Sequence, residues 1–148
     1  MDDIDRSLLQ ILAADSGSTA TEISKKVNLS IPAVNKRIAR MRENGTIERF
    51  TIQVNAQAVG KGVQAFILVT LNQYALAGEL LDYVQRERDI LDCYAVTGEY
   101  DYLLRVCARD IEDLESKLLT LKSKHCVAKS YTMFTLMNHK QTPGPLPD

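Results

Sequence analysis

The sequence predicts an α+β protein in which three helices are followed by a β-α-β-β-α-β unit. Apolar residues recur at helical spacing as far as residue 44, glycines flank Lys61, and runs typical of strands begin at residue 63. The chain has 148 residues, 45% hydrophobic and 25% charged, which is an ordinary globular composition with length enough for two small domains. We expect domains over residues 1–54 and 63–148, joined by a hinge over residues 55–62.

The first two predicted helices are short. Asp2 or Asp3 can cap the first helix, whose apolar residues follow the i, i+4, i+7, i+8 pattern: Ile4, Leu8, Ile11 and Leu12. This helix ends around residues 15–17. We expect Thr21 to cap the second helix and Asn28 to end it in a left-handed conformation, so that only a tight turn precedes the third helix.

The third helix begins with a Ser30 cap and with Pro32 in its first turn, where a missing N–H costs nothing. It ends at residues 44–45. One apolar stripe holds it in a core: Val34, Ile38 and Met41. Residues 47–50 and 51–54 are rich in β-branched residues and predict two short strands. Together these elements predict a winged helix-turn-helix, with a three-helix bundle as the alternative.

Positive charge is concentrated in this region. Residues 24–49 carry a net charge of +5, whereas the whole chain carries −1. A solvated helix face would explain the charge alone, but an amphipathic helix with a basic outer face also fits the major groove of DNA, which is about 12 Å wide. We therefore expect double-stranded DNA as a partner. The candidate contact residues are Lys25, Ser30, Asn35, Lys36, Arg37, Arg40 and Arg42.

These candidates divide into two expected roles. Asn35, Lys36 and Arg37 are expected to reach bases or nearby phosphates. Lys25, Arg40 and Arg42 are expected to hold the DNA backbone.

The second half of the chain alternates strands and helices. Strands are predicted over residues 63–71, 90–97, 102–108 and 127–137. A helix with apolar residues at helical spacing follows Leu76 and ends near residues 86–89, and Asp110 caps another. This order predicts a ferredoxin-like βαββαβ sheet domain. The tail after residue 140 contains three prolines and no periodicity, so we expect it to extend along the surface.

The predicted sheet has apolar residues on both faces. Tyr131 and Met133 alternate with Phe134 in the last strand, while Leu104 alternates with Leu103 in the third. The two helices can cover only one face. A second copy packed against the other face is the simplest completion, so we expect a homodimer.

Five motifs follow one another along the chain: Asp3-x-Asp5-x-x-Leu8-Leu9-x-x-Leu12, Leu29-Ser30 to Arg37-Ile38, Asn44-Gly45-Thr46-Ile47, Ala65-Phe66-Ile67-Leu68-Val69 and Val96-Thr97-Gly98-Glu99-Tyr100-Asp101-Tyr102. Each is weak alone. In this order and spacing, the chain resembles the Lrp/AsnC (leucine-responsive, or feast/famine) family over nearly its whole length. Arg105 departs from the expected pattern, because it occupies a strand position that we expect to be apolar.

The resemblance implies a transcription regulator whose dimers assemble further, into a tetramer or octamer, and whose second domain senses amino acids. It also implies an effector site lined by Thr97, Gly98, Glu99, Tyr100, Asp101, Ser130 and Thr132. The chemistry of these residues agrees with an effector site, because Gly98 lets the backbone approach a ligand closely and Asp101 can pair with the α-ammonium group of an amino acid. The alternative is a hairpin that needs Gly98 only for its positive φ.

Other functional classes find little support in the sequence. The three cysteines, Cys93, Cys107 and Cys126, fit reduced thiols, with a redox role left open. Two histidines and no nucleophile, phosphate-loop or dinucleotide motif argue against an enzyme, and we expect no metal or cofactor apart from an amino-acid effector.

Without a signal peptide or a long apolar run, a cytoplasmic location is expected. The rival function is an amino-acid-binding module that does not contact DNA.

Overall fold

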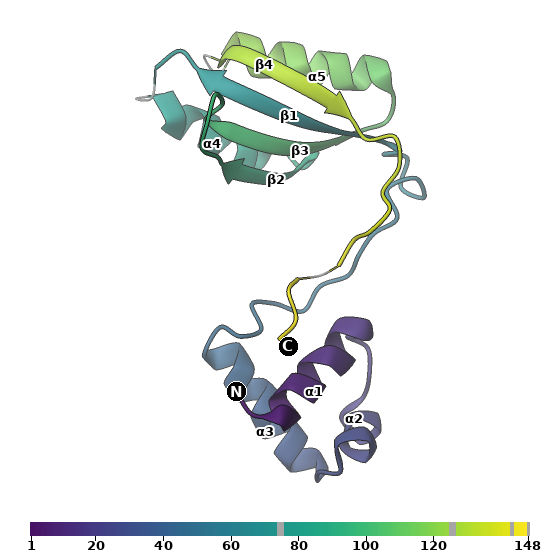
Figure 1. The fold of residues 1–148 in the computed structure, drawn as a ribbon. Helices are drawn as coiled ribbons and strands as arrows, with labels where there is room; N and C mark the ends of the chain where they lie inside the picture. The colour runs from purple at the N-terminus through teal and green to yellow at the C-terminus, as the bar shows by residue number, and fades with distance from the viewer. Residues whose placement is uncertain (74–75, 125–126, 143, 148) are drawn as a thin grey trace. The chain divides into compact units, whose positions relative to one another are not determined.

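The computed structural model describes residues 1–73, 76–124, 127–142 and 144–147. Contacts divide the chain into two compact units, one of Met1–Gln53 with His139–Asp148 and one of Val54–Asn138. Figure 1 traces both units as ribbons. No helix in the described ranges is long and apolar enough to cross a membrane.

Three helices build the first unit: α1 (Asp3–Ala14), α2 (Ala20–Val27) and α3 (Ile31–Glu43). Asp2 caps α1 by accepting the Asp5 N–H at 2.8 Å, and Ser30 caps α3, as predicted. The predicted cap of α2 was wrong. Thr19, not Thr21, caps it, because Thr19 and Glu22 accept each other's backbone N–H groups in a capping box.

One small core joins these helices. Its buried side chains come from all three helices: Leu8, Leu12, Ile23, Val34 and Met41. The turn between α2 and α3 closes tightly because Asn28 adopts φ 53°, the left-handed conformation that the sequence predicted for it. The core face of α3 points toward α1 and α2.

The two strands predicted over residues 47–50 and 51–54 are not formed within the described chain. The two predicted strands adjoin at Phe50 and Thr51 and leave no residues for the two-residue turn that commonly joins a hairpin. Without a paired neighbour, β-branched composition does not make a strand. Apolar side chains of this segment stay exposed instead: Phe50, Ile52 and Val54.

The second unit is a four-stranded antiparallel sheet with two helices. Its elements are β1 (Val63–Leu71), α4 (Ala77–Arg86), β2 (Ile90–Ala95), β3 (Tyr102–Ala108), α5 (Ile111–Lys124) and β4 (Val127–Phe134). The sheet order β2-β3-β1-β4 is the predicted ferredoxin-like arrangement. Strands β2 and β4 end earlier than predicted. For β4 the reason is that its partner β1 begins at Val63, and the last backbone bond of this edge joins Thr135 N to Gln64 O at 2.9 Å.

The sheet has one covered and one open face. Side chains of β1 and β3 pack with those of α4 and α5 in the core, including Ile67, Leu80, Leu104 and Leu114. Cross-strand pairs place a row of apolar residues on the opposite face: Tyr94, Leu103, Leu68 and Tyr131. Both tyrosines are more than half exposed. The predicted apolar second face is therefore present and uncovered in the single chain.

Candidate DNA-contact and effector sites

Helix α3 presents a polar face to solvent. Asn35 and Lys36 are exposed, while Val34 and Met41 hold the other side of the helix in the core. Asn and Lys side chains on an exposed helix face can reach base edges or phosphates in a major groove. The structure thus leaves these two predicted contact residues accessible.

Two other predicted contacts, Arg37 and Arg40, lie against α1. Arg37 Nη1 lies 2.7 Å from Asp2 Oδ2 and 2.8 Å from Asp5 Oδ1. Arg40 Nη2 lies 2.6 Å from Asp5 Oδ2. The backbone N–H of Asp5, followed by the Arg37 guanidinium, lowers the pKa of Asp2, and these carboxylates raise the pKa of Arg37. We call Asp2, Asp5, Arg37 and Arg40 the acid clamp.

The sequence reading missed the acid clamp, although one signal pointed to it. Asp5 shares the buried face of α1 with Leu8 and Leu12, at i, i+3 and i+7 spacing, and only 2% of its surface is exposed. A carboxylate in an apolar stripe requires a partner, because burial of an unpaired charge is costly. Its partners lie more than thirty residues away in the chain, which no local pattern reveals.

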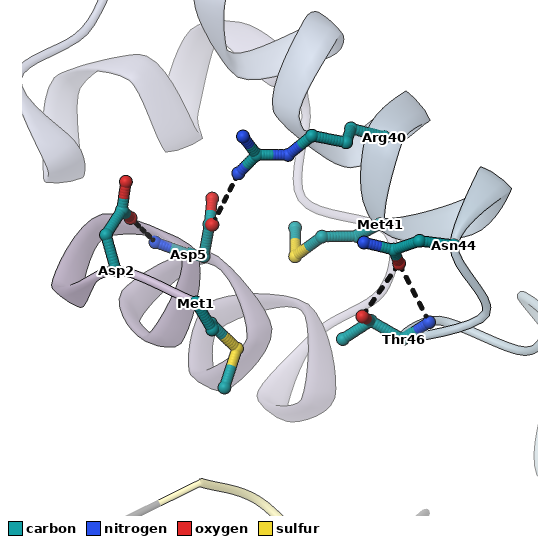
Figure 2. A pocket seen from close by; sticks show the side chains of 7 residues that line it. All are labelled: Met1, Asp2, Asp5, Arg40, Met41, Asn44 and Thr46. Atoms are coloured by element: carbon teal, nitrogen blue, oxygen red, sulfur yellow. Dashed lines mark hydrogen bonds and ion pairs between the residues drawn. The ribbon is translucent and has the colours of Figure 1, made fainter.

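An open pocket of about 580 Å³ lies beside the acid clamp. Figure 2 shows its lining, in which Asp5 faces Arg40. On its far wall the Asn44 side chain accepts hydrogen bonds from the Thr46 backbone N–H at 3.1 Å and from its hydroxyl at 2.8 Å. These bonds fix the turn that follows α3.

The other predicted DNA contacts take varied positions. Lys25 is exposed in the last turn of α2, where its charge complements the helix dipole. The Ser30 hydroxyl accepts the Ala33 N–H at 3.4 Å and so serves as a cap. The Arg42 guanidinium lies 6.0 Å from the centre of the Phe50 ring. Lys25 and Arg42 therefore remain exposed cations.

The predicted effector loop, residues 97–101, is docked on the end of β1. Asp101 Oδ2 accepts the Leu71 N–H at 2.8 Å, and the Asp101 N–H donates to Val69 O at 2.9 Å. The Thr70 hydroxyl donates to Glu99 O at 3.2 Å. Gly98 adopts φ 116°, which other residues rarely adopt, so the loop does need glycine there.

An edge residue of β4 also holds this loop. The Lys129 ammonium pairs with the Glu99 carboxylate and lies 5.2 Å from the centre of the Tyr100 ring. Ser130 and Thr132 do not join it. They pair with Val69 and Ile67, which belong to the covered face, whereas Lys129 pairs with Thr70 on the open face. Within one chain, Ser130 and Thr132 therefore lie on the side of the sheet opposite to Lys129 and its contacts with Glu99 and Tyr100.

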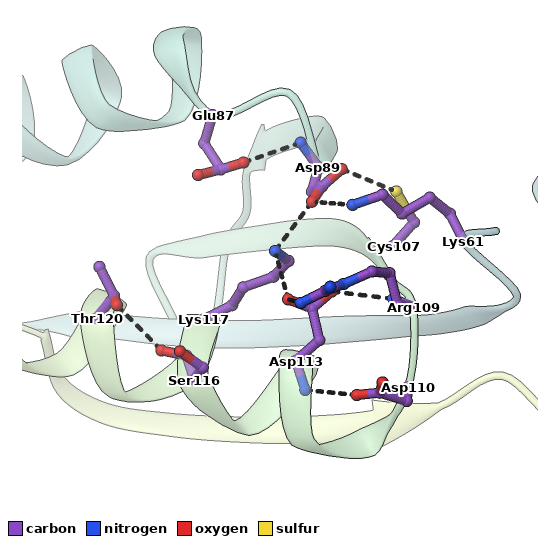
Figure 3. Close-up of polar contacts among 10 residues, drawn as sticks. All are labelled: Lys61, Glu87, Asp89, Cys107, Arg109, Asp110, Asp113, Ser116, Lys117 and Thr120. Carbon is purple, nitrogen blue, oxygen red and sulfur yellow. Dashed lines mark hydrogen bonds and ion pairs between the residues drawn. The ribbon is translucent and has the colours of Figure 1, made fainter. Parts of the chain in front are cut away.

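A network of ion pairs ties the hinge to the second unit (Figure 3). Asp89 Oδ2 lies 2.6 Å from Lys61 Nζ and 2.9 Å from Lys117 Nζ, and Lys117 also contacts Asp113 at 3.2 Å. Burial opposes ionisation of Asp89, but the two ammonium groups prevail and lower its pKa. The sequence reading missed this network, which joins Lys61 of the hinge to the turn between α4 and β2 and to α5.

Of the cysteines that the structure describes, Cys93 is half-buried and Cys107 is buried. Burial raises the pKa of the Cys93 and Cys107 thiols, and the Asp89 carboxylate, 3.8 Å from Cys107 Sγ, adds to the effect on Cys107. Cys126 lies outside the described residues. Among the residues described, no group of His, Cys, Asp and Glu could hold a metal ion.

Comparison with known proteins matches both units. The model of the Lrp/AsnC ligand binding domain matches residues 64–145, and that of a winged helix-turn-helix DNA-binding domain matches residues 1–48. The chain is 35% identical over 145 residues to the HTH-type transcriptional regulator FL11 of Pyrococcus abyssi, covering 96% of this chain and 93% of that protein. It is 32% identical over 123 residues to the regulator LrpA of Mycobacterium tuberculosis, covering 81% and 82% of the two chains.

Solved structures agree over almost the full length. A transcriptional regulator from Neisseria meningitidis in complex with L-methionine has a TM-score of 0.92 at 29% identity, covering 97% of this chain and 94% of that one. A feast or famine regulatory protein from M. tuberculosis, also complexed with L-methionine, has a TM-score of 0.91 at 27% identity, covering 99% of each chain. This protein, with its DNA-binding and ligand-binding domains, therefore belongs to the Lrp/AsnC family of transcriptional regulators.

Proposed function

We propose that this regulator binds DNA as a homodimer, through the exposed face of α3, and responds to a small effector, an amino acid, bound by its second unit. The observation that carries the proposal is the solvent-facing pair Asn35 and Lys36 on a helix whose other side is locked in a core. Asn suits adenine and Lys suits guanine or a phosphate in a major groove. Lys25 and Arg42 are the exposed cations that we assign to the DNA backbone.

The open sheet face supports the homodimer. Tyr94 and Tyr131 are 53% and 54% exposed at the two ends of its apolar row, which is unusual for side chains of this size unless a partner covers them. Arg105, the unexpected charge in this sheet, donates from Nε to the Asp92 carboxylate on the neighbouring strand. The pair is neutral overall, so a second copy can cover it at lower cost than a lone cation. Two α3 helices in one dimer can engage successive half-sites.

The effector assignment rests on the loop over residues 97–101 and on the relatives. Asp101 uses one carboxylate oxygen to accept the Leu71 N–H, and we assign the other to the α-ammonium of an amino acid. Ser130 and Thr132 belong to a site of this kind only if it is completed by another copy, since they face away from the loop of their own chain. Two relatives were solved with L-methionine, which makes methionine the first effector to test.

One set of measurements tests this function. Light scattering gives the mass of the full chain, and fluorescence anisotropy gives its affinity for duplex DNA selected from a random library, with and without each of the twenty amino acids. We expect a dimer or a multiple of dimers whose mass or DNA affinity shifts with an amino acid. A monomer would refute the homodimer, unaltered binding with all twenty would refute the effector, and failure to select any DNA would favour the ligand-binding module that does not contact DNA.

A further inference from the structure

The acid clamp joins α1 to α3 through a single buried carboxylate. Asp5 Oδ1 lies 2.8 Å from Arg37 Nη1 and Asp5 Oδ2 lies 2.6 Å from Arg40 Nη2, so each oxygen of Asp5 holds one arginine. Asp2, which caps α1, adds a second acceptor for Arg37 at 2.7 Å. The Asp5 side chain is only 3% exposed, whereas the two arginine side chains remain 25% and 56% exposed.

This geometry restrains the rotation of α3 about its own axis. Arg37 and Arg40 are three residues apart and lie on the same flank of the helix. An α-helix advances about 100° per residue, so Asn35 lies roughly 160° around the axis from Arg37. The two contacts of the Asp5 carboxylate hold the flank of α3 that carries Arg37 and Arg40. They therefore also determine the direction in which the opposite side of α3, with Asn35, faces.

We propose that Asp5 is a positioning residue for DNA reading: it sets the rotation of α3 and withdraws Arg37 from the DNA. This inference rests on the proposed function, in which α3 is the helix that reads DNA. This proposal replaces our expectation that Arg37 reaches bases or nearby phosphates by an internal role. Arg40 has one contact with Asp5 and its side chain remains half exposed. Asp5 therefore orients the Arg40 guanidinium at the edge of the face of α3 that reads DNA.

The proposal predicts a loss of sequence discrimination rather than of all DNA binding. Base contacts need fixed distances and directions, because hydrogen bonds weaken steeply when misaligned. Flexible lysine side chains follow phosphates through a small rotation of the helix, so electrostatic binding tolerates it. A loosened α3 should therefore bind random DNA about as well as before and its selected sequence less well.

The test compares Asp5→Asn with Asp3→Asn in the full chain. Both substitutions remove one negative charge from the first turn of α1, but Asp3 is exposed and Asp5 is buried in the clamp. Anisotropy gives the affinity for the library-selected duplex and for a random-sequence duplex, at a temperature at which circular dichroism shows each variant folded. We expect Asp5→Asn to lower the ratio of the two affinities about tenfold, the loss of one good base contact, and Asp3→Asn to leave it unchanged.

Two further variants keep the test decisive. Arg37→Lys preserves charge but cannot contact both acids in the same way, so it should lower the ratio without unfolding the domain, and it decides the question if Asp5→Asn does not fold. An unchanged ratio in the folded variants, or an equal loss on both duplexes, would overturn the positioning role. Lys36→Ala separates the two proposals: if it leaves binding to both duplexes unchanged, the assignment of α3 as the DNA-reading helix fails, not merely the role of Asp5.

Discussion

Replacing Tyr131 by Ala should weaken self-association far more than it weakens the fold. Tyr131 lies on β4 beside Leu68 on the open sheet face and is 54% exposed in the single chain. Aromatic side chains bury about 150–250 Å² when fully covered, so a dimer removes roughly 100 Å² of each Tyr131 ring from water. At about 25 cal/mol per Å², one ring contributes about 2.5 kcal/mol and the two rings of a symmetric dimer about 5 kcal/mol.

That free energy corresponds to an increase of several thousandfold in the dimer dissociation constant. Sedimentation velocity over a dilution series measures it, and urea unfolding shows whether the protomer is intact. Leu119→Ala is the matched control, because Leu119 is 61% exposed on α5, which lies on the other side of the sheet. We expect the control to dissociate like the wild type. Because the ring lies outside the core cluster, loss of Tyr131 should leave the free energy of unfolding of the protomer within about 1 kcal/mol of the wild type.

The opposite outcome would be informative. If Tyr131→Ala and Leu119→Ala dissociate at the same concentration, the open face is not where two copies meet. If Tyr131→Ala unfolds at lower urea without dissociating, the ring stabilises the protomer, and the argument from its exposure is wrong.

Three other changes test the remaining assignments. Lys36→Ala should reduce the slope of log affinity against log salt by about one unit, because one phosphate contact is lost, and an unchanged slope in anisotropy titrations would remove that contact. Asp101→Ala should leave DNA binding without ligand intact but abolish the response to methionine; a normal thermal shift with methionine would contradict the effector site. Asp89 has a lowered pKa, so its ion pairs stabilise the fold at neutral pH and lose that effect as pH falls through the folded-state pKa, below about 4. Asp89→Asn should therefore narrow the difference in urea stability between pH 7 and pH 3. An unchanged difference would show that the ion pairs of Asp89 do not contribute to the pH dependence of stability.

Local sequence patterns predicted the helices and strands well where the decisive contacts join residues close in sequence, or where apolar residues pack into the core. Strands β1 and β3 begin and end at the predicted residues, because they are the inner strands and their runs of apolar residues pack on the helices. The caps of α1 and α3 were likewise predicted, since a cap is a contact between residues three apart.

The wrong predictions occurred where two nearby residues could each serve as a helix cap, or where a segment needs a pairing partner from elsewhere in the chain. Thr19 and Thr21 are both good caps, and Glu22, three residues after Thr19, decides between them through the capping box. The strands predicted after Gly45 had the right composition but no neighbour to pair with. The DNA contacts stay predictions: Asn35 and Lys36 are exposed, and Arg37 pairs with acids at the start of α1.

The sequence by itself determined the family, the order of the helices and strands and the concentration of positive charge around α3, because these depend on periodicity and on motifs of adjacent residues. Only the tertiary structure showed which charges pair with each other inside the chain. Arg37 meets Asp5 across 32 residues and Lys61 meets Asp89 across 28. Such contacts arise when packing brings distant elements together, so no local pattern distinguishes an arginine in a clamp from one exposed to DNA.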